Sequence, residues 1–150
     1  MTKFQKIPLV LLRISLGWMF FYAGITKVLN PSWSAEGYLK SAKTFSWFYN
    51  IVSAPSALPV TNFVNEWGLT LLGVALILGV FVRLSSILAA IMMGLYYLPI
   101  LDFPYPNPHS FVVDEHIIYI FALLTLASFR GGSWSLNKLF GKHSKLTDGK

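Results

Sequence analysis

The sequence contains no cysteine and few charged residues, and both shortages narrow what the protein can be. Without cysteine, the chain cannot supply disulfides, thiolate nucleophiles, iron–sulfur ligands or zinc–thiolate sites. Charged residues make up 12% of the 150 residues, and hydrophobic residues make up 55%. A typical soluble domain carries ~25% charged residues. The composition therefore predicts an integral membrane protein built as a single domain over residues 1–150.

Histidine is also scarce, because the chain holds only His109, His116 and His143. A haem or copper centre needs more ligands than these positions offer, so we expect no metal or haem. The net charge of +6 does not indicate nucleic acid, because the basic residues are sparse and lie at the ends of apolar segments. We therefore expect no nucleic-acid partner.

The apolar residues gather in segments long enough to cross a bilayer, which takes about 20 residues at ~1.5 Å rise each. We expect four spans, at about residues 7–29, 60–82, 84–101 and 111–129. The apolar run 60–101 is about twice as long as one span needs, so it must fold into a hairpin. The polar break at residues 83–86 marks the expected turn. The predicted fold is all-α, an integral membrane four-helix bundle.

A different pattern follows the first span, in residues 34–52. Apolar and aromatic positions recur there at helical spacing, with lysines on the other faces: Tyr38, Ala42, Phe45, Tyr49 and Val52. This pattern predicts an amphipathic helix lying at the membrane surface between spans one and two.

Lysine and arginine predict the orientation in the cell membrane, because cytoplasmic loops carry an excess of both. With four spans, most basic residues fall on the side of the termini, including a basic tail at residues 130–150. We therefore expect a multi-pass protein with both termini in the cytoplasm.

The first span carries a stripe of unusual residues at helical spacing: Arg13, Gly17, Phe20, Gly24 and Lys27. The two glycines allow another helix to approach closely. A charge inside a span costs roughly 2.5–3.5 kcal/mol, so it is usually paired, snorkelled or functional. This stripe is the expected inner face of the first span.

The predicted topology collects polar groups in one layer near the outer surface: Lys27, Glu66, Asp114, Glu115 and His116. Five aromatic residues are expected at or near a similar depth: Tyr22, Trp67, Tyr96, Tyr97 and Tyr119. Such a layer suits binding an anion or exchanging protons with a small redox molecule.

Each member of this layer also has a structural interpretation, which the sequence leaves open. Lys27 can snorkel to lipid phosphates, and Glu66 can form a structural ion pair. Asp114 can cap the N-terminus of the last helix, and Glu115 can interact with the helix dipole in its first turn. His116 can be a histidine at the membrane interface. Arg13 lies outside this layer, about 20 Å from Lys27 along the helix, where it can snorkel inward, bind a lipid or partner, or meet the head of a bound quinone.

Three stretches together resemble the DoxX/DoxD family, and within it the DoxD-like membrane subunit of thiosulfate:quinone oxidoreductase. They are residues 12–39 with the phrase FYAGITK, residues 66–86, and residues 113–140 with the phrase DEH. The resemblance implies a four-helix membrane bundle linked to quinone reduction. It also implies thiosulfate or a related reduced sulfur compound as electron donor, and a second subunit.

The polar layer and the resemblance lead to one main hypothesis, a membrane subunit that oxidises a sulfur compound at the outer face and reduces quinone. The expected catalytic residues are Glu66, Glu115 and His116. The expected substrate-binding residues are Lys27, Arg13, Asp114, Tyr22, Trp67 and Tyr97. The expected partners are the lipid bilayer, a second oxidoreductase subunit and, as an open alternative, further copies of the chain. Two other functions stay open: a non-catalytic scaffold for a soluble oxidoreductase, and a small-molecule conduit.

Overall fold

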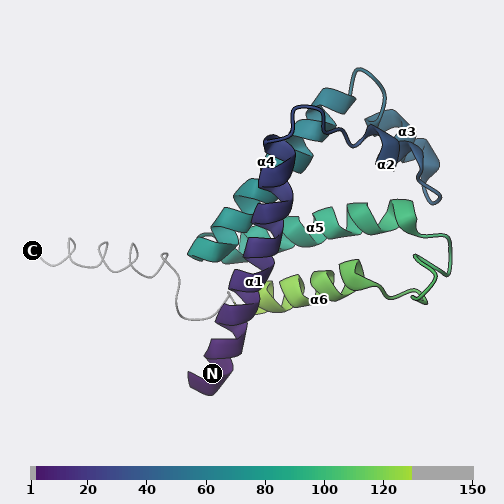
Figure 1. Ribbon diagram of the computed structural model, residues 1–150. Helices are drawn as coiled ribbons and strands as arrows, with labels where there is room; N and C mark the ends of the chain where they lie inside the picture. Colours follow the sequence, from purple (N-terminus) through teal and green to yellow (C-terminus); the bar gives the residue numbers. More distant parts are fainter. Residues whose placement is uncertain (1–2, 130–150) are drawn as a thin grey trace, which may run out of the picture.

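The computed structural model describes residues 3–129, and helices dominate that range (Figure 1). They are α1 (Lys3–Val28), α2 (Glu36–Lys40), α3 (Ser46–Val52), α4 (Leu58–Leu78), α5 (Val82–Ile100) and α6 (Glu115–Ser128). Three segments, Lys6–Val28, Leu58–Leu78 and Val82–Ile100, are long and apolar enough to cross a membrane. The predicted all-α membrane class is therefore confirmed for these residues. The predicted basic tail, residues 130–150, lies outside them.

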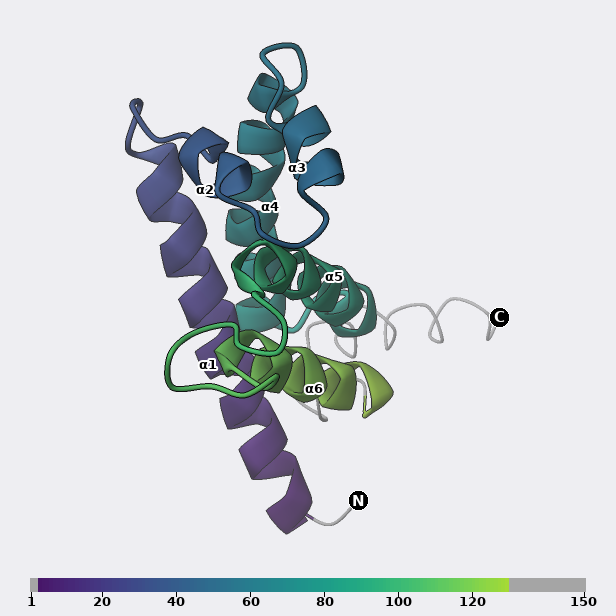
Figure 2. The same ribbon diagram turned by 90° about the vertical axis from the view of Figure 1, so that its right-hand side faces the viewer.

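Helices α1 and α4 pack side by side in opposite directions, and glycine sets their separation (Figures 1 and 2). A Cβ atom added at Gly24 would lie 2.4 Å from the backbone nitrogen of Thr70. One added at Gly73 would lie 2.3 Å from the backbone nitrogen of Phe21, and one at Gly17 would lie 2.9 Å from Ile77. Only glycine fits such a close approach. The predicted contact role of Gly17 and Gly24 is confirmed.

Helices α5 and α6 form a second antiparallel pair, which crosses the first pair steeply (Figures 1 and 2). The core lies where the pairs meet. It is built from buried side chains of all four helices, including Phe20, Leu69, Leu76, Ala89, Met93, Leu123 and Leu126. A smaller cluster of Ala35, Leu39 and Tyr49 holds α2 and α3 against the rest of the molecule.

The turn between α4 and α5 lies at residues 79–81, just before the polar residues 83–86 that the sequence predicts for it. Gly79 ends α4 with φ 69°, a left-handed conformation that glycine adopts without steric cost. Arg83 and Ser86 instead belong to the first turns of α5, where Ser86 is fully buried. The predicted turn position is therefore corrected by a few residues.

The fourth predicted span, 111–129, is helical only over Glu115–Ser128. Its 14 residues rise about 21 Å, less than the ~30 Å hydrocarbon core of a bilayer. The helix begins late because Val112 has a positive φ of 59° and Asp114 caps the helix. The described structure therefore has three candidate spans and a shorter apolar helix.

The expected surface helix at residues 34–52 is two short helices, α2 and α3, rather than one. The chain breaks between them because Phe45 takes a positive φ of 54°. The linker there bonds to the end of α5: the Lys43 N–H donates to the Pro99 carbonyl at 3.1 Å, and the Thr44 hydroxyl donates to the Leu101 carbonyl. These tertiary bonds replace the helical bonds that the periodicity predicts.

Candidate functional site

A polar cavity of about 490 Å³ lies where the C-terminal ends of α1 and α5 meet the N-terminal end of α6 and the first half of α4. Its lining residues are Lys27, Trp33, Ser34, Ala35, Tyr38, Asn65, Tyr96, Ile100, Glu115 and His116. The volume falls within the ~300–1,000 Å³ that is usual for small-molecule sites. Three residues of the predicted layer, Lys27, Glu115 and His116, therefore share one cavity.

Aromatic rings hold the ammonium group of Lys27. Its Nζ lies 4.8 Å from the centre of the Trp33 ring and 5.3 Å from that of Tyr96, within the range of cation–π attraction. The negative charge of Glu66 also acts on Lys27, although no direct ion pair joins the two among the described residues. Because ring faces satisfy an ammonium only in part, Lys27 can still donate hydrogen bonds to a ligand.

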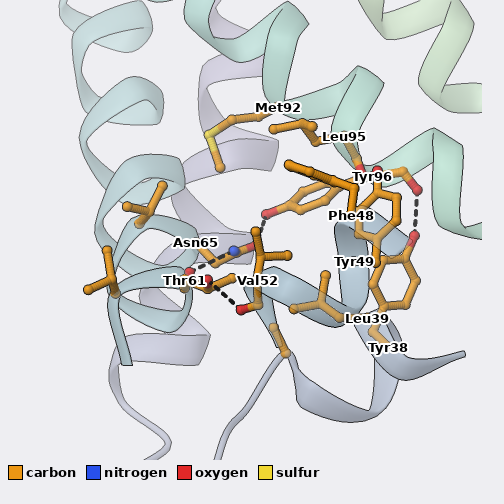
Figure 3. Close-up of a pocket in the computed structure, with 13 residues that line it drawn as sticks. Tyr38, Leu39, Phe48, Tyr49, Val52, Thr61, Asn65, Met92, Leu95 and Tyr96 are labelled. Atoms are coloured by element: carbon orange, nitrogen blue, oxygen red, sulfur yellow. Dashed lines mark hydrogen bonds between the residues drawn. The ribbon is translucent and has the colours of Figure 1, made fainter. Parts of the chain in front are cut away.

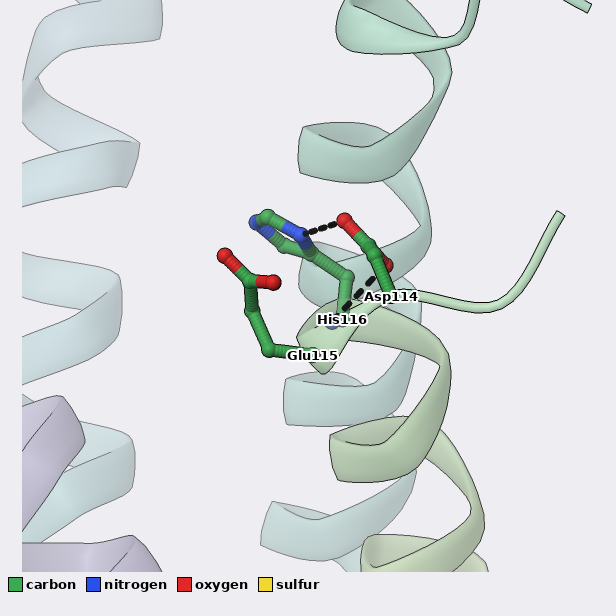
Figure 4. A group of neighbouring side chains, drawn as sticks. All are labelled: Asp114, Glu115 and His116. Carbon is green, nitrogen blue, oxygen red and sulfur yellow. Dashed lines mark hydrogen bonds and ion pairs between the residues drawn. The ribbon is translucent and has the colours of Figure 1, made fainter. Parts of the chain in front are cut away.

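Asp114 accepts hydrogen bonds at the N-terminal end of α6 with both of its carboxylate oxygens (Figure 4). Its Oδ1 accepts hydrogen bonds from the backbone N–H groups of His116 at 3.0 Å and Ile117 at 3.3 Å. Its Oδ2 accepts from Nδ1 of the His116 ring at 2.8 Å. The N-cap interpretation of Asp114 is therefore confirmed. Because Nδ1 donates to Asp114, the other ring nitrogen, Nε2, is the one left for a different partner.

Asp114, Glu115 and His116 also offer ligand atoms that all lie within 4.8 Å of one another. These are ligand types for a divalent cation. One feature opposes a cation here, because Lys27 brings a positive charge to the same cavity. The hydrogen bond from Nδ1 of His116 to Asp114 does not oppose one, since it leaves Nε2 available as a ligand atom. The group therefore offers side chains of the types that exchange protons and that bind cations.

Two further predicted residues adjoin the cavity without lining it. Glu66 lies on α4 directly after Asn65, where it acts on Lys27 through its charge. Tyr97 is buried, and its hydroxyl donates to the backbone carbonyl of Val112 in the loop before α6. Tyr97 thus holds the loop that presents the start of α6.

Three other predicted residues lie away from the cavity. Tyr22 on α1 and Trp67 on α4 are 60% and 40% exposed, as lipid-facing aromatic residues of spans would be. Arg13 is buried in α1, fourteen residues before Lys27, which puts it about 20 Å away along the helix. The structure does not bring these three residues together with Lys27, Glu115 and His116.

The cavity also contains Tyr96, which the sequence places at a similar depth, and residues that sequence reasoning does not assign to it, mainly Trp33, Tyr38 and Asn65. Burial raises the pKa of Tyr38 to about 12, with smaller effects from the nearby charges of Tyr49 and Asp114. Its hydroxyl donates to the Tyr96 carbonyl. The sequence does mark Asn65 as unusual, because it is an amide within an apolar run and directly precedes Glu66.

Comparison with known proteins gives a family match for the chain. The DoxX family model matches residues 9–98, more than half of the chain. The match includes most of α1 and α5 and all of α4, and thus Lys27, Asn65 and Tyr96 of the cavity, whereas α6 follows it. No curated protein and no solved structure matches the chain. The extent of the family match shows that the chain belongs to the DoxX family.

Proposed function

We propose that the protein is the membrane subunit of a quinone-linked oxidoreductase, and that the polar cavity binds the quinone ring. The observation that carries this proposal is the convergence of Lys27, Glu115 and His116 in one cavity beside the rings of Trp33 and Tyr96. A cation, a carboxyl group, an imidazole and aromatic surfaces suit a flat molecule with two polar oxygens.

The residues fit quinone chemistry in their hydrogen-bonding capacity. A bound quinone supplies an acceptor for two electrons and two protons. The Nε2 atom of His116 and the carboxyl group of Glu115 can each hold a proton at the cavity, while Asp114 fixes the His116 ring. Lys27 supplies a positive charge that attracts an electron-rich group.

The two electrons come from outside the chain in this proposal. Lys27 would draw in an anionic reductant, and the resemblance suggests thiosulfate or a related reduced sulfur compound. A second, soluble subunit is the other route by which electrons could reach the cavity. The negative charge of Glu66 on α4 favours the charged form of Lys27, on which the first route depends.

The test is quinone reduction by purified protein in lipid nanodiscs, with thiosulfate as donor, alone and with any co-purified subunit. Glu115→Gln and His116→Ala should each lower the rate by about 10²–10⁴-fold if their protons are transferred in the reaction. Glu36→Gln and His109→Ala are matched controls outside the cavity lining and should leave the rate unchanged.

A second outcome would support the scaffold alternative. Equal, measurable rates in wild type, Glu115→Gln and His116→Ala would remove both residues from the mechanism. A different result, in which the purified chain shows no activity but pulls down a stoichiometric soluble protein from detergent extract, would show that the chain acts as an anchor for that protein.

We also propose that the chain crosses the membrane four times, with both termini in the cytoplasm and the polar cavity near the outer surface. The absence of cysteine makes this simple to test, since any introduced cysteine is unique. An impermeant maleimide applied to intact cells should label Lys40→Cys, next to the cavity, and not Arg83→Cys, at the α4–α5 turn. The reverse labelling would invert the proposed orientation.

A further inference from the structure

A second cavity, which we call the apolar cavity, lies beneath α2 and α3 against α4 and α5 (Figure 3). Its volume is about 240 Å³. Its walls are largely apolar and include Leu39, Phe48, Val52, Val64, Met92 and Leu95. No residue of the proposed reaction, Lys27, Glu115 or His116, reaches it.

The few polar side chains in the walls are already hydrogen-bonded to the protein. The Tyr49 hydroxyl donates to the Leu95 carbonyl at 2.9 Å, and the Thr61 hydroxyl donates to the Val52 carbonyl at 2.8 Å. The Tyr96 hydroxyl donates to Oδ1 of Asn65 at 2.6 Å (Figure 3). A polar ligand would break these bonds, so an apolar occupant suits the space best.

The apolar cavity and the polar cavity share part of their walls. Ala35, Tyr38, Asn65 and Tyr96 line both of them. At 240 Å³ the apolar cavity is smaller than the ~300–1,000 Å³ of most complete ligand sites, so it suits one part of a larger molecule. The shared residues show that the two cavities adjoin each other.

We propose that the apolar cavity holds the first part of the isoprenoid chain of a quinone whose ring lies in the polar cavity. This inference rests on the proposed function. When the ring lies at Lys27 and His116, the apolar cavity lies on the other side of Tyr38 and Tyr96, between α4 and α5. Both of these helices are candidate membrane spans, so the remainder of the chain can continue into the lipid.

The experiment uses the full chain in nanodiscs and a quinone that carries a diazirine on its first isoprene unit. Benzoquinone and naphthoquinone versions cover both common ring types. After illumination, mass spectrometry maps the labelled residues, with and without an excess of the same ring bearing a methyl group in place of the chain. We expect labels on α3 and α5, at Phe48, Val52 or Met92. An excess of the competitor that lacks the isoprenoid chain, which we call the chainless ring, should abolish these labels.

Two variants on one face of α4 sharpen the test. Val64 lines the apolar cavity, and Leu71 lies two helical turns further along and does not. Their exposed fractions are similar, at 51% and 60%. Val64→Trp should reduce the cavity labels about tenfold or more, because an indole ring fills the space that the chain needs. Leu71→Trp should leave them unchanged.

The outcomes separate this inference from the proposed function. Labels that the chainless ring abolishes, but that lie only outside the apolar cavity, would overturn the chain site and leave the ring site standing. Labels that the chainless ring does not affect would overturn both, because the probe would then bind without its ring in the polar cavity.

Discussion

Asp114 accepts a hydrogen bond from Nδ1 of His116 at 2.8 Å while its other oxygen caps the helix that carries this histidine. Asp114 is 3% exposed, so the contact is shielded from water. The same carboxylate therefore starts α6, orients the imidazole and selects its tautomer. Local helix capping and the proposed proton chemistry depend on one side chain.

Asp114→Asn should invert the tautomer of His116 with little loss of stability. The asparagine oxygen can still accept from the backbone N–H groups, because Asn is as good an N-cap as Asp. Its NH₂ group would then occupy the place of Oδ2 and donate to Nδ1, which moves the ring proton to Nε2. Nitrogen-15 NMR of histidine-labelled protein measures the tautomer directly, with His109 as an internal reference.

Asp114→Ala is the companion variant, since it removes the cap as well. Loss of an N-cap costs about 0.5–2 kcal/mol, so this variant should unfold at a lower temperature than Asp114→Asn. An unchanged His116 tautomer in Asp114→Asn would show that the carboxylate does not control the ring.

Packing between the first two spans was accessible from sequence because it depends on residue size at helical spacing. Gly17 and Gly24 lie one above the other on the first span, and the structure packs both against α4. Lys27 and the acidic start of α6 could also be placed, since the ends of spans bring charged residues to similar depths. Their shared cavity follows from that depth.

Other features depend on contacts between distant segments, which periodicity does not report. The break at Phe45 comes from hydrogen bonds between the α2–α3 linker and the end of α5. Tyr38 and Tyr96 share a cavity wall because α2 lies against α5, where the Tyr38 hydroxyl donates to the Tyr96 carbonyl. The α4–α5 turn lies at Gly79, because backbone geometry rather than polarity determines where α4 ends.

Alanine at Gly24 or Gly73 should destabilise the protein, because the new Cβ would overlap backbone atoms of the facing helix. Overpacking of this kind costs typically ~1–3 kcal/mol. Gly94→Ala is the matched control, since its Cβ would meet nothing within 4 Å, and alanine favours a helix by ~1 kcal/mol over glycine. Thermal unfolding in detergent should show lower midpoints for the first two variants and an equal or higher one for the control. Equal midpoints in all three would contradict the close α1–α4 approach.

Tyr38 should make the folded protein less stable above about pH 10. Burial raises its pKa to about 12, against ~10 in an unfolded chain. Because the raised pKa disfavours the charged form in the folded state, its stabilising contribution is complete below about pH 10 and is lost as the pH rises toward 12. Thermal midpoints measured across this range should fall less steeply in Tyr38→Phe than in wild type. The comparison uses slopes, because the variant also loses the hydrogen bond to the Tyr96 carbonyl at every pH. Parallel slopes would rule out the effect.

Phe81 should be a position where glycine stabilises the protein. Its φ is 47°, in the left-handed region that costs roughly 1–2 kcal/mol for a residue with a side chain. Phe63 is a matched control, because it is exposed to nearly the same degree, at 61% against 65%, but lies inside α4. Phe81→Gly should raise the thermal midpoint, whereas Phe63→Gly should lower it by the ~1 kcal/mol that glycine costs within a helix. If both variants lowered the midpoint equally, the Phe81 ring would contribute more in lipid than its backbone conformation costs.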